Sequence, residues 1–508
     1  MNLLFSASVF SFYTLVSRVL GYVRDILIAV FLGASIYADA FFVAFRLPNT
    51  FRRLFAEGTF NAAFVPGYTS EKIKNKKKGK IFADEVLLFL TISLLFIVLT
   101  VEIFTPYFVY LIAPGFYSNT DKFDIAVEFT RITFPFLLFV SLSSFFSGIL
   151  NSNNKFAAAA AAPIILNIIL ILSFTISQSQ ELNYARNLSY GVTLAGIIQM
   201  FFLIYFTKKY YRPSIKFKIK ISSKLKFFIR KLLPSIFSSG VTQINILIGT
   251  IIASFESGAV SYLYYADRVY QINLAIAGIA VGTVSLPILS KAVKNNNINK
   301  VSSIQNRSLE LSMLLSIPAC FGIIIASEQI INALFGYGSF LQEDVITTSQ
   351  ALKFFGYGIP AFALIKVLSN FFFARDNTLT PFHISLLTVF LNIIISLSFF
   401  KNVGFIIIPI ATSISTWIGV IIYILLLKKR KYLIFKNYLL KSSFKIILCT
   451  ILMSLILLYG LDFFRESLHF TNKFKSIYLI FIVSFAATIY FVTCYLIGIL
   501  KLKNYKIN

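Results

Sequence analysis

Long hydrophobic runs separated by short polar segments fill the whole chain. A helix that crosses the hydrocarbon core of a bilayer needs about 20 predominantly apolar residues. The runs predict about fourteen membrane-spanning helices, and an even number places both termini on one side of the membrane. They cover residues 8–32, 36–60, 86–113, 131–150, 157–177, 188–207, 232–255, 259–289, 309–330, 347–373, 380–400, 404–427, 443–463 and 476–499.

The polar segments indicate which side that is. Of the 47 lysines and arginines, 30 fall in five segments that follow every second run, at 70–86, 208–231, 291–307, 428–445 and 501–506. Segments of the opposite parity are sparse in charge or acidic, as at Asp121, Asp124 and Glu128. Because Lys and Arg accumulate in cytoplasmic loops, we expect the five segments to be cytoplasmic loops and both termini to be cytoplasmic.

Composition excludes several classes of protein. The chain of 508 residues is 57% hydrophobic and 13% charged, whereas soluble domains have about 45–50% apolar and about 25% charged residues. An ordinary soluble enzyme and a disordered protein are therefore excluded. The net charge of +27 would suggest nucleic acid in a soluble protein. In a membrane protein, cationic cytoplasmic loops account for it, so no nucleic-acid partner is expected.

Residue types that commonly bind metals or perform catalysis are scarce. The three cysteines lie singly in apolar runs, and the chain has two histidines. The phosphate-binding motif GxxxxGK[ST] and the hydrolase motifs GxSxG and HExxH do not occur. The sequence therefore predicts no metal, no cofactor and no catalytic residue.

An internal repeat indicates how the helices are grouped. Four short matches recur in order at offsets of 224 to 228, which indicates duplication of a six-helix unit. Because six is even, the two halves would share one orientation and be related by a pseudo-two-fold axis along the membrane normal, as in some transporters. We expect six-helix bundles at 1–225 and 226–431, and two additional helices at 432–508. The matches are Tyr37-Ala38-Asp39 with Tyr265-Ala266-Asp267, Gly58-Thr59 with Gly282-Thr283, Pro135 with Pro360, and Leu166–Ile169 with Leu391–Ile394.

Charged residues inside the first two runs are unusual. An arginine at a helix centre costs about 2.5–3.5 kcal/mol on insertion scales, yet five of the 14 arginines lie in the first 53 residues. Asp39, Arg46 and Arg53 are seven residues apart and share a helix face, provided that the helix continues through Pro48. The whole set is Arg18, Arg24, Asp25, Asp39, Arg46, Arg52, Arg53 and Glu57, with Asp267 and Arg268 in the eighth run.

Two explanations fit these charges. Internal ion pairs, such as Arg24 with Asp25 and Arg53 with Glu57, would account for part of the set. The favoured explanation is a water-filled cavity that accepts an anionic substrate, since pairing leaves an excess of cations. The guanidinium group binds phosphate oxygens in pairs. A local preference for Arg in a Lys-rich chain is therefore informative.

Several motifs resemble the MurJ/MviN family. SRVLGYVRD at 17–25 and the long block ADAFFVAFRLPNTFRRLFAEGTFNAAFVP at 38–66 are similar to that family's opening and to its most recognisable stretch. The resemblance covers essentially the whole chain. Further similar motifs are YYADR at 264–268, GTVSLPILSK at 282–291, APGF at 113–116 and ITFPF at 132–136.

The resemblance implies a lipid II flippase of the multidrug/oligosaccharidyl-lipid/polysaccharide exporter superfamily, in the bacterial inner membrane. Such a protein carries the undecaprenyl-diphosphate-linked peptidoglycan precursor from the cytoplasmic to the periplasmic leaflet by alternating access. The last two helices would form a groove for the lipid tail. The family's cavity arginines correspond to Arg18, Arg24, Arg52 and Arg268, with Asp25 positioning Arg24, and Asp39, Asn49 and Glu57 also in its motif.

Other functions stay open from the residues alone. A flippase for another polyprenyl-diphosphate-linked sugar fits the charges nearly as well. A drug/cation antiporter of the same superfamily would carry an excess of intramembrane carboxylates, and a membrane-embedded transferase would need paired acids. The expected partners are lipid II and membrane lipids. The chain is expected to act as a monomer. A further expected partner is the cell-wall synthesis machinery.

Overall fold

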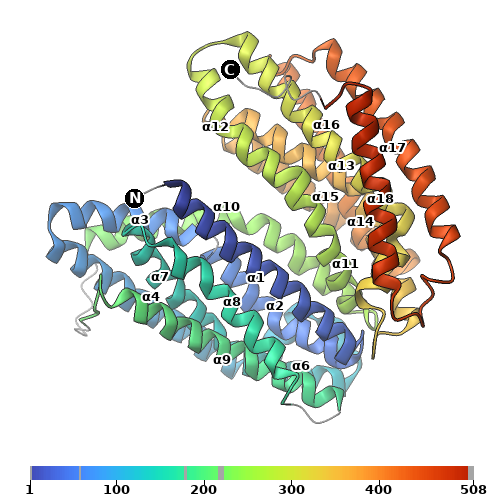
Figure 1. Ribbon diagram of the computed structural model, residues 1–508. Coiled ribbons are helices and arrows are strands. Elements are labelled where there is room, and N and C mark those ends of the chain that lie inside the picture. The colour runs from blue at the N-terminus through green and yellow to red at the C-terminus, as the bar shows by residue number, and fades with distance from the viewer. Residues whose placement is uncertain (1–2, 57–58, 177–179, 215–221, 501–508) are drawn as a thin grey trace. The chain divides into compact units, whose positions relative to one another are not determined.

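The computed structural model describes residues 3–56, 59–176, 180–214 and 222–500, and this part of the chain forms helices and no strand. Ten of the described helical stretches are long and apolar enough to cross a membrane. The all-helical membrane architecture expected from the sequence is therefore confirmed. Contacts divide the chain into two compact units, Met1–Ser261 and Tyr262–Asn508, and most of their helices are labelled in Figure 1.

The first unit contains ten α-helices and the short 3-10 helix η1 (Pro114–Ser118) within its described residues. Helices α7 and α8 both pack against α9, α1 packs against α8, and α2 contacts α6 and α7. The α-helices are α1 (Leu3–Leu32), α2 (Ile36–Ala56), α3 (Thr59–Lys74), α4 (Lys76–Ile103), α5 (Thr105–Ile112), α6 (Thr120–Thr133), α7 (Phe136–Ser152), α8 (Phe156–Ser173), α9 (Glu181–Thr207) and α10 (Ser223–Ala253).

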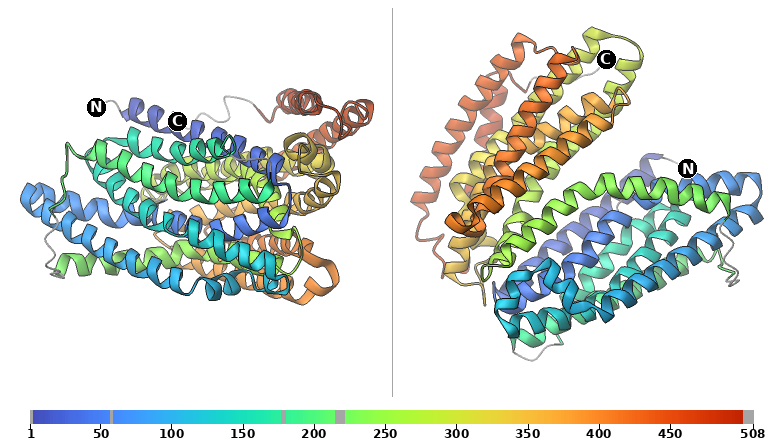
Figure 2. Two further views of the ribbon diagram at one scale, coloured as in Figure 1. Left: turned by 90° about the horizontal axis from the view of Figure 1, so that it is seen from below. Right: turned by 180° about the vertical axis from the view of Figure 1, so that it is seen from behind.

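Helix α10 belongs to the first unit by its packing. It contacts α2, α3, α4 and α5, and the right view of Figure 2 shows its green ribbon beside the blue helices of the first unit. Phe228 at its start is buried, with its ring edge-on to Phe60 at a centroid distance of 5.8 Å. The contacts thus divide the chain after α10, whereas the repeat predicts a boundary at residue 225, in the first turn of α10.

The lysine-rich segment 70–86 is helical, and the expectation of a loop there is wrong. Helix α3 continues to Lys74 and α4 begins at Lys76, so Asn75 alone separates them. Asn75 caps α4, since its side chain accepts a hydrogen bond from the Lys77 N–H at 2.7 Å. Lysine has a good helix propensity, so a helix can continue well beyond an apolar run.

The second unit contains long helices that are locally distorted. Helices α11 (Ala259–Leu274) and α12 (Val281–Lys294) are joined by a π-helical segment, η2 (Ala275–Ala280). Helix α13 (Ile298–Phe335) has a kink at Ala326, whose backbone leaves the helical region. The remaining elements are α14 (Gln342–Phe373), α15 (Leu379–Val403), η3 (Gly404–Ile406), α16 (Ile407–Lys429), α17 (Asn437–Phe463) and α18 (Lys475–Leu496).

One packing pattern occurs in both units and agrees with the suggested repeat. Helices α7 and α8 pack against α9, and α14 and α15 pack in the same way against α16. Asn167 in α8 and Asn392 in α15 are both buried. The Tyr-Ala-Asp match is less exact, because Asp39 lies in the first turn of α2 whereas Asp267 lies about two turns into α11. The last two helices, α17 and α18, pack on each other and on α13.

Candidate substrate-binding site

Arg24 is held from two sides inside the first unit. Its Nε and Nη2 atoms donate to Asp25 Oδ1 at 3.0 and 2.6 Å. Its Nη1 atom donates to Asn167 Oδ1 in α8 at 3.0 Å. Arg24 is 6% exposed and Asp25 is 2% exposed. The predicted ion pair between the two residues is therefore present, and the guanidinium group has a fixed orientation.

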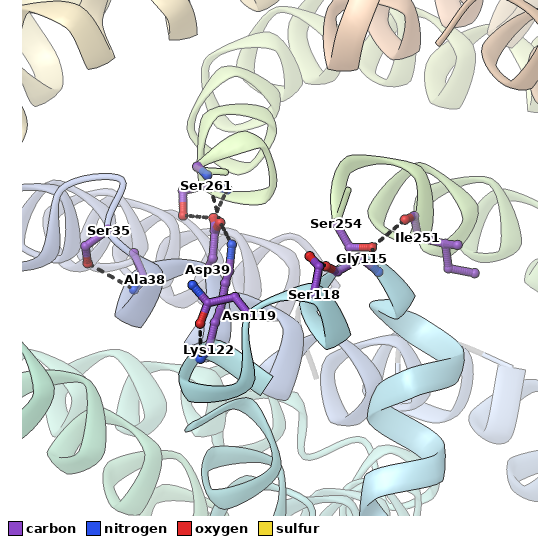
Figure 3. Close-up of polar contacts among 11 residues, drawn as sticks. Ser35, Ala38, Asp39, Gly115, Ser118, Asn119, Lys122, Ile251, Ser254 and Ser261 are labelled. Carbon is purple, nitrogen blue, oxygen red and sulfur yellow. Dashed lines mark hydrogen bonds and ion pairs between the residues drawn. The ribbon is translucent and has the colours of Figure 1, made fainter. Parts of the chain in front are cut away.

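Asp39 is the centre of a second buried network (Figure 3). One oxygen accepts hydrogen bonds from Lys122 Nζ at 2.6 Å and from the Gly258 N–H at 3.0 Å. The other accepts from the N–H and the hydroxyl of Ser261 at 2.9 and 2.6 Å. Gly258 and Ser261 flank the first turn of α11, where N–H groups have no partner within the helix. Asp39 therefore caps α11 from a distant part of the chain.

A close backbone contact holds the connection before α11 (Figure 3). The Gly115 N–H donates to Ser254 Oγ at 3.0 Å, and a Cβ atom on Gly115 would lie 2.3 Å from the Ser254 carbonyl oxygen. Only glycine allows this approach. The APGF motif thus holds the end of α10, while Asp39 holds the start of α11.

The other predicted residues of the first unit lie on α1 and α2. Helix α2 continues through Pro48 to Ala56, so the condition for a shared face of Asp39, Arg46 and Arg53 is met. Arg52 is half-buried, and its Nε donates to Asn49 Oδ1 at 3.0 Å. Arg18 is exposed on α1. Glu57 lies outside the described residues.

Arg268 lies in the second unit, on α11. Its Nη2 atom donates to the Tyr264 hydroxyl at 2.7 Å, and its guanidinium carbon lies 4.7 Å from the centre of the same ring. An aromatic ring under a guanidinium group stabilises the cation without neutralising it. Its neighbour Asp267 accepts a hydrogen bond from Gln271. Tyr264 therefore holds the guanidinium group of Arg268 in place, as Asp25 and Asn167 hold that of Arg24.

Sequence reasoning missed three polar residues. Asn167 was noticed as part of a repeat, but nothing local indicated its contact with Arg24. Lys122 is a single cation in an acidic segment, which could have marked it, and it is 5% exposed. Lys366 is an exposed lysine within the apolar helix α14, next to Gly278 of the π-helical segment. Ionisable residues inside membrane helices commonly mark functional sites.

The Lys122–Asp39 pair changes the charge balance. In the sequence, Asp39 is one of the anions that could pair with the arginines of the first two runs. Because Lys122 is bonded to it, Asp39 does not offset them, and the local excess of cations is larger than the sequence suggested. The arrangement suits an anion with several oxygen acceptors.

The described residues form helices, ten of them long and apolar enough to cross a membrane, and one arginine, Arg24, is buried among them. These features define a multi-pass membrane protein of the transporter class. Its relatives specify the family. The family model described as "Lipid II flippase MurJ" matches residues 28–480. A "Probable lipid II flippase MurJ" from Rickettsia prowazekii (strain Madrid E) is 36% identical over 99% of this chain and 99% of its own. This chain belongs to the lipid II flippase MurJ family, and it is accordingly a protein of the bacterial inner membrane.

Solved structures agree with that assignment. The structure "Lipid II flippase MurJ, inward closed conformation" has 28% sequence identity and a TM-score of 0.82, covering 96% of this chain and 98% of its own. An inward-facing multidrug resistance MATE family transporter of the MOP superfamily has 16% identity and a TM-score of 0.65, covering 82% and 94%. The second likeness shows a common fold.

Proposed function

We propose that this protein translocates lipid II from the cytoplasmic to the periplasmic leaflet for peptidoglycan synthesis. The name of its family indicates the substrate. The observation that carries the proposal is Arg24, a buried cation inside an apolar helix bundle that Asp25 and Asn167 hold in one orientation. A transporter of this kind moves its substrate without catalysing a reaction.

The proposed topology has fourteen spans with both termini in the cytoplasm. The alternation of lysine-rich and acidic segments supports it. The six-helix halves, 1–225 and 226–431, would be related by a pseudo-two-fold axis along the membrane normal. The shared packing of α7, α8 and α9 with that of α14, α15 and α16 supports this duplication.

The proposed substrate contacts are the arginines that the family's motif suggests, Arg18, Arg24, Arg52 and Arg268. They would bind the diphosphate, which offers many acceptor oxygens and a high negative charge. Asp25 would position Arg24, and Asn49 would position Arg52 through its hydrogen bond at 3.0 Å. Asp39 would shape the site indirectly, because its carboxylate is bonded to Lys122, Gly258 and Ser261. Glu57 remains a candidate from the motif.

Lys366 extends this set in the second unit. A lysine exposed from an apolar helix needs water or an anion nearby. Its position beside the π-helical segment places it next to a part of the helix that often has a functional role. Its ammonium group would add one more positive charge to the guanidinium groups of the four arginines.

The two C-terminal helices are proposed to guide the lipid tail. Helices α17 and α18 present many exposed apolar side chains, including Phe444, Leu448, Leu455, Phe481 and Phe485. These residues suit an isoprenoid chain as well as ordinary lipid. Transport would follow alternating access, in which the two halves rock while the tail stays in the membrane. The monomer would suffice for transport, and the cell-wall synthesis machinery is the proposed protein partner.

A liposome assay tests the proposal. Purified protein is reconstituted with lipid II in the inner leaflet, and a membrane-impermeant probe of the headgroup reports its arrival outside. Wild type should transfer lipid II, and Arg24→Ala should not. Equal transfer by both proteins would contradict the proposal that Arg24 binds the substrate. Transfer of another polyprenyl-diphosphate-linked sugar in preference to lipid II would contradict the substrate.

A further inference from the structure

We infer that Asn167 is a positioning residue for substrate binding, which holds Arg24 in place without neutralising its charge. This inference rests on the proposed function of Arg24 in binding a diphosphate. Asn167 is neither in the motif that the family resemblance marked nor near Arg24 in the sequence. The contact joins α1 to α8 across 143 positions of the chain.

The hydrogen bonds of Asn167 define the orientation of its amide group. Its Oδ1 accepts from Arg24 Nη1 at 3.0 Å. Its Nδ2 donates to the Ser17 carbonyl oxygen at 2.8 Å and lies 3.4 Å from Ser17 Oγ. A flipped amide would place its NH₂ group against the guanidinium donors, so the two neighbours together select one orientation. Because Asn167 is 6% exposed, little water is present to replace these bonds.

Asp25 and Asn167 contribute differently to holding Arg24. Asp25 supplies one negative charge on the Nε and Nη2 edge of the guanidinium group. Asn167 supplies a neutral acceptor on Nη1. A carboxylate at the second position would hold the arginine equally well, but it would place two anions against one cation. In a buried site that would oppose the approach of an anionic substrate. A neutral amide holds the guanidinium group in place and adds no negative charge, so the site still favours binding of a diphosphate.

The suggested repeat provides a matched comparison. Asn392 occupies the same place in the Leu-Asn-Ile-Ile match, lies in α15 and is also 6% exposed. Its Nδ2 donates to Thr412 Oγ1, and its Oδ1 accepts from Ser396 Oγ, both at 3.1 Å. Asn392 therefore bonds to hydroxyl groups in a comparable buried setting. A difference between variants at the two positions reports the contact with Arg24 rather than the loss of a buried amide.

The test measures lipid II affinity, transport in liposomes and thermal stability for four variants. Asn167→Leu keeps the volume and removes the bonds, and Asn167→Asp keeps an acceptor but adds a charge. Asn392→Leu and Asn392→Asp are the controls. We expect Asn167→Leu to lose about tenfold or more in lipid II affinity, because it loses a hydrogen bond to a charged group. We expect a similar loss for Asn167→Asp, because a second carboxylate beside Arg24 opposes the approach of an anionic substrate. The control variants should keep affinity near the wild-type value, with stability changes similar to those of the Asn167 variants.

Two results would overturn the inference while the proposed function stands. One is wild-type affinity for Asn167→Asp, since a neutral amide would then be unnecessary. The other is an equal loss of affinity at positions 167 and 392 in proportion to lost stability, which would make Asn167 a purely structural residue. If the wild-type protein itself neither binds nor transports lipid II, the proposed function fails, and the inference fails with it.

Discussion

The ammonium group of Lys122 lies 2.6 Å from a carboxylate oxygen of Asp39, and both side chains are almost completely buried. The same carboxylate accepts the first N–H groups of α11. The Lys122 ammonium also lies 4.1 Å from the centre of the Phe116 ring. One buried ion pair thus fixes three separate segments of the first unit, namely α2, α6 and the connection into α11.

Breaking this pair should strongly destabilise the protein. Lys122→Met leaves the Asp39 carboxylate buried without its cation, and we expect a loss of about 3–5 kcal/mol in unfolding free energy. Adding Asp39→Asn should recover part of the loss. The control is Arg186→Met, which removes a pair with Glu128 that is 38% and 39% exposed and should cost only about 0–1 kcal/mol. Equal losses for the two single variants would contradict the prediction.

Replacement of the proposed diphosphate ligands should abolish function without unfolding the protein. Arg24→Ala or Arg268→Ala as the sole copy should fail to support growth, although each variant inserts and is present at wild-type levels. Arg24→Lys should also be impaired, because a point charge replaces a planar fork. Lys76→Gln and Lys77→Gln change exposed residues of α4 and should have little effect. Normal growth from either alanine variant would refute the site.

Gly115 should not tolerate a side chain. In Gly115→Ala the new Cβ would lie 2.3 Å from the Ser254 carbonyl oxygen, so the backbone must move. We expect a loss of about 1–3 kcal/mol in stability, measured as a lower unfolding temperature. Gly322→Ala is the control, since no atom lies within 4 Å of its added Cβ. The idea fails if both variants unfold at the same temperature.

Acid should weaken the link between α3 and α10 through Glu71. The side-chain hydrogen bond from Lys224, assisted by Lys74, lowers the pKa of Glu71 below its ordinary value of 4.5. A lowered pKa in the folded state means that the stabilisation is present above the ordinary value and is lost as the pH falls through the folded one. The effect should be small, because both lysines are about half exposed or more.

The measurement is the unfolding temperature between about pH 6 and pH 3. Glu71→Gln should unfold at a lower temperature than wild type near neutral pH, and the difference should shrink as the pH falls. Glu466→Gln, at an exposed residue after α17, should show no such trend. A difference in unfolding temperature between the two proteins that grows as the pH falls would contradict the predicted direction.

Much of the helical layout could be predicted from hydropathy, because a membrane helix needs one continuous apolar run. Helices α8, α9, α16 and α17 lie close to the predicted runs. The errors arise where polar residues continue a helix. In residues 70–86, five of the six lysines are exposed, whereas Phe82, Ala83 and Val86 are buried, so a helix can place the two kinds of residue on different faces. Hydropathy averages over a window and cannot detect such a division of faces.

The candidate site was less predictable, because its partners are distant in sequence. The Arg24–Asp25 pair joins adjacent residues and was expected, whereas the Arg24–Asn167 bond spans 143 positions. Lys122 was hidden for the same reason, and its pairing with Asp39 spans 83 positions. A sequence shows which charges require partners, but the fold selects those partners.

Helix α10 has a consequence for any attempt to divide the gene in two. By order it opens the second copy of the suggested repeat, yet by packing it completes the first unit. A fragment that ends at residue 214 would expose the surfaces of α2 and α3 that α10 covers. A cut between α10 and α11 would instead remove the Asp39 cap from the downstream fragment. We therefore expect neither cut to yield two fragments that fold on their own, so the unit that folds is larger than the unit that the suggested repeat marks.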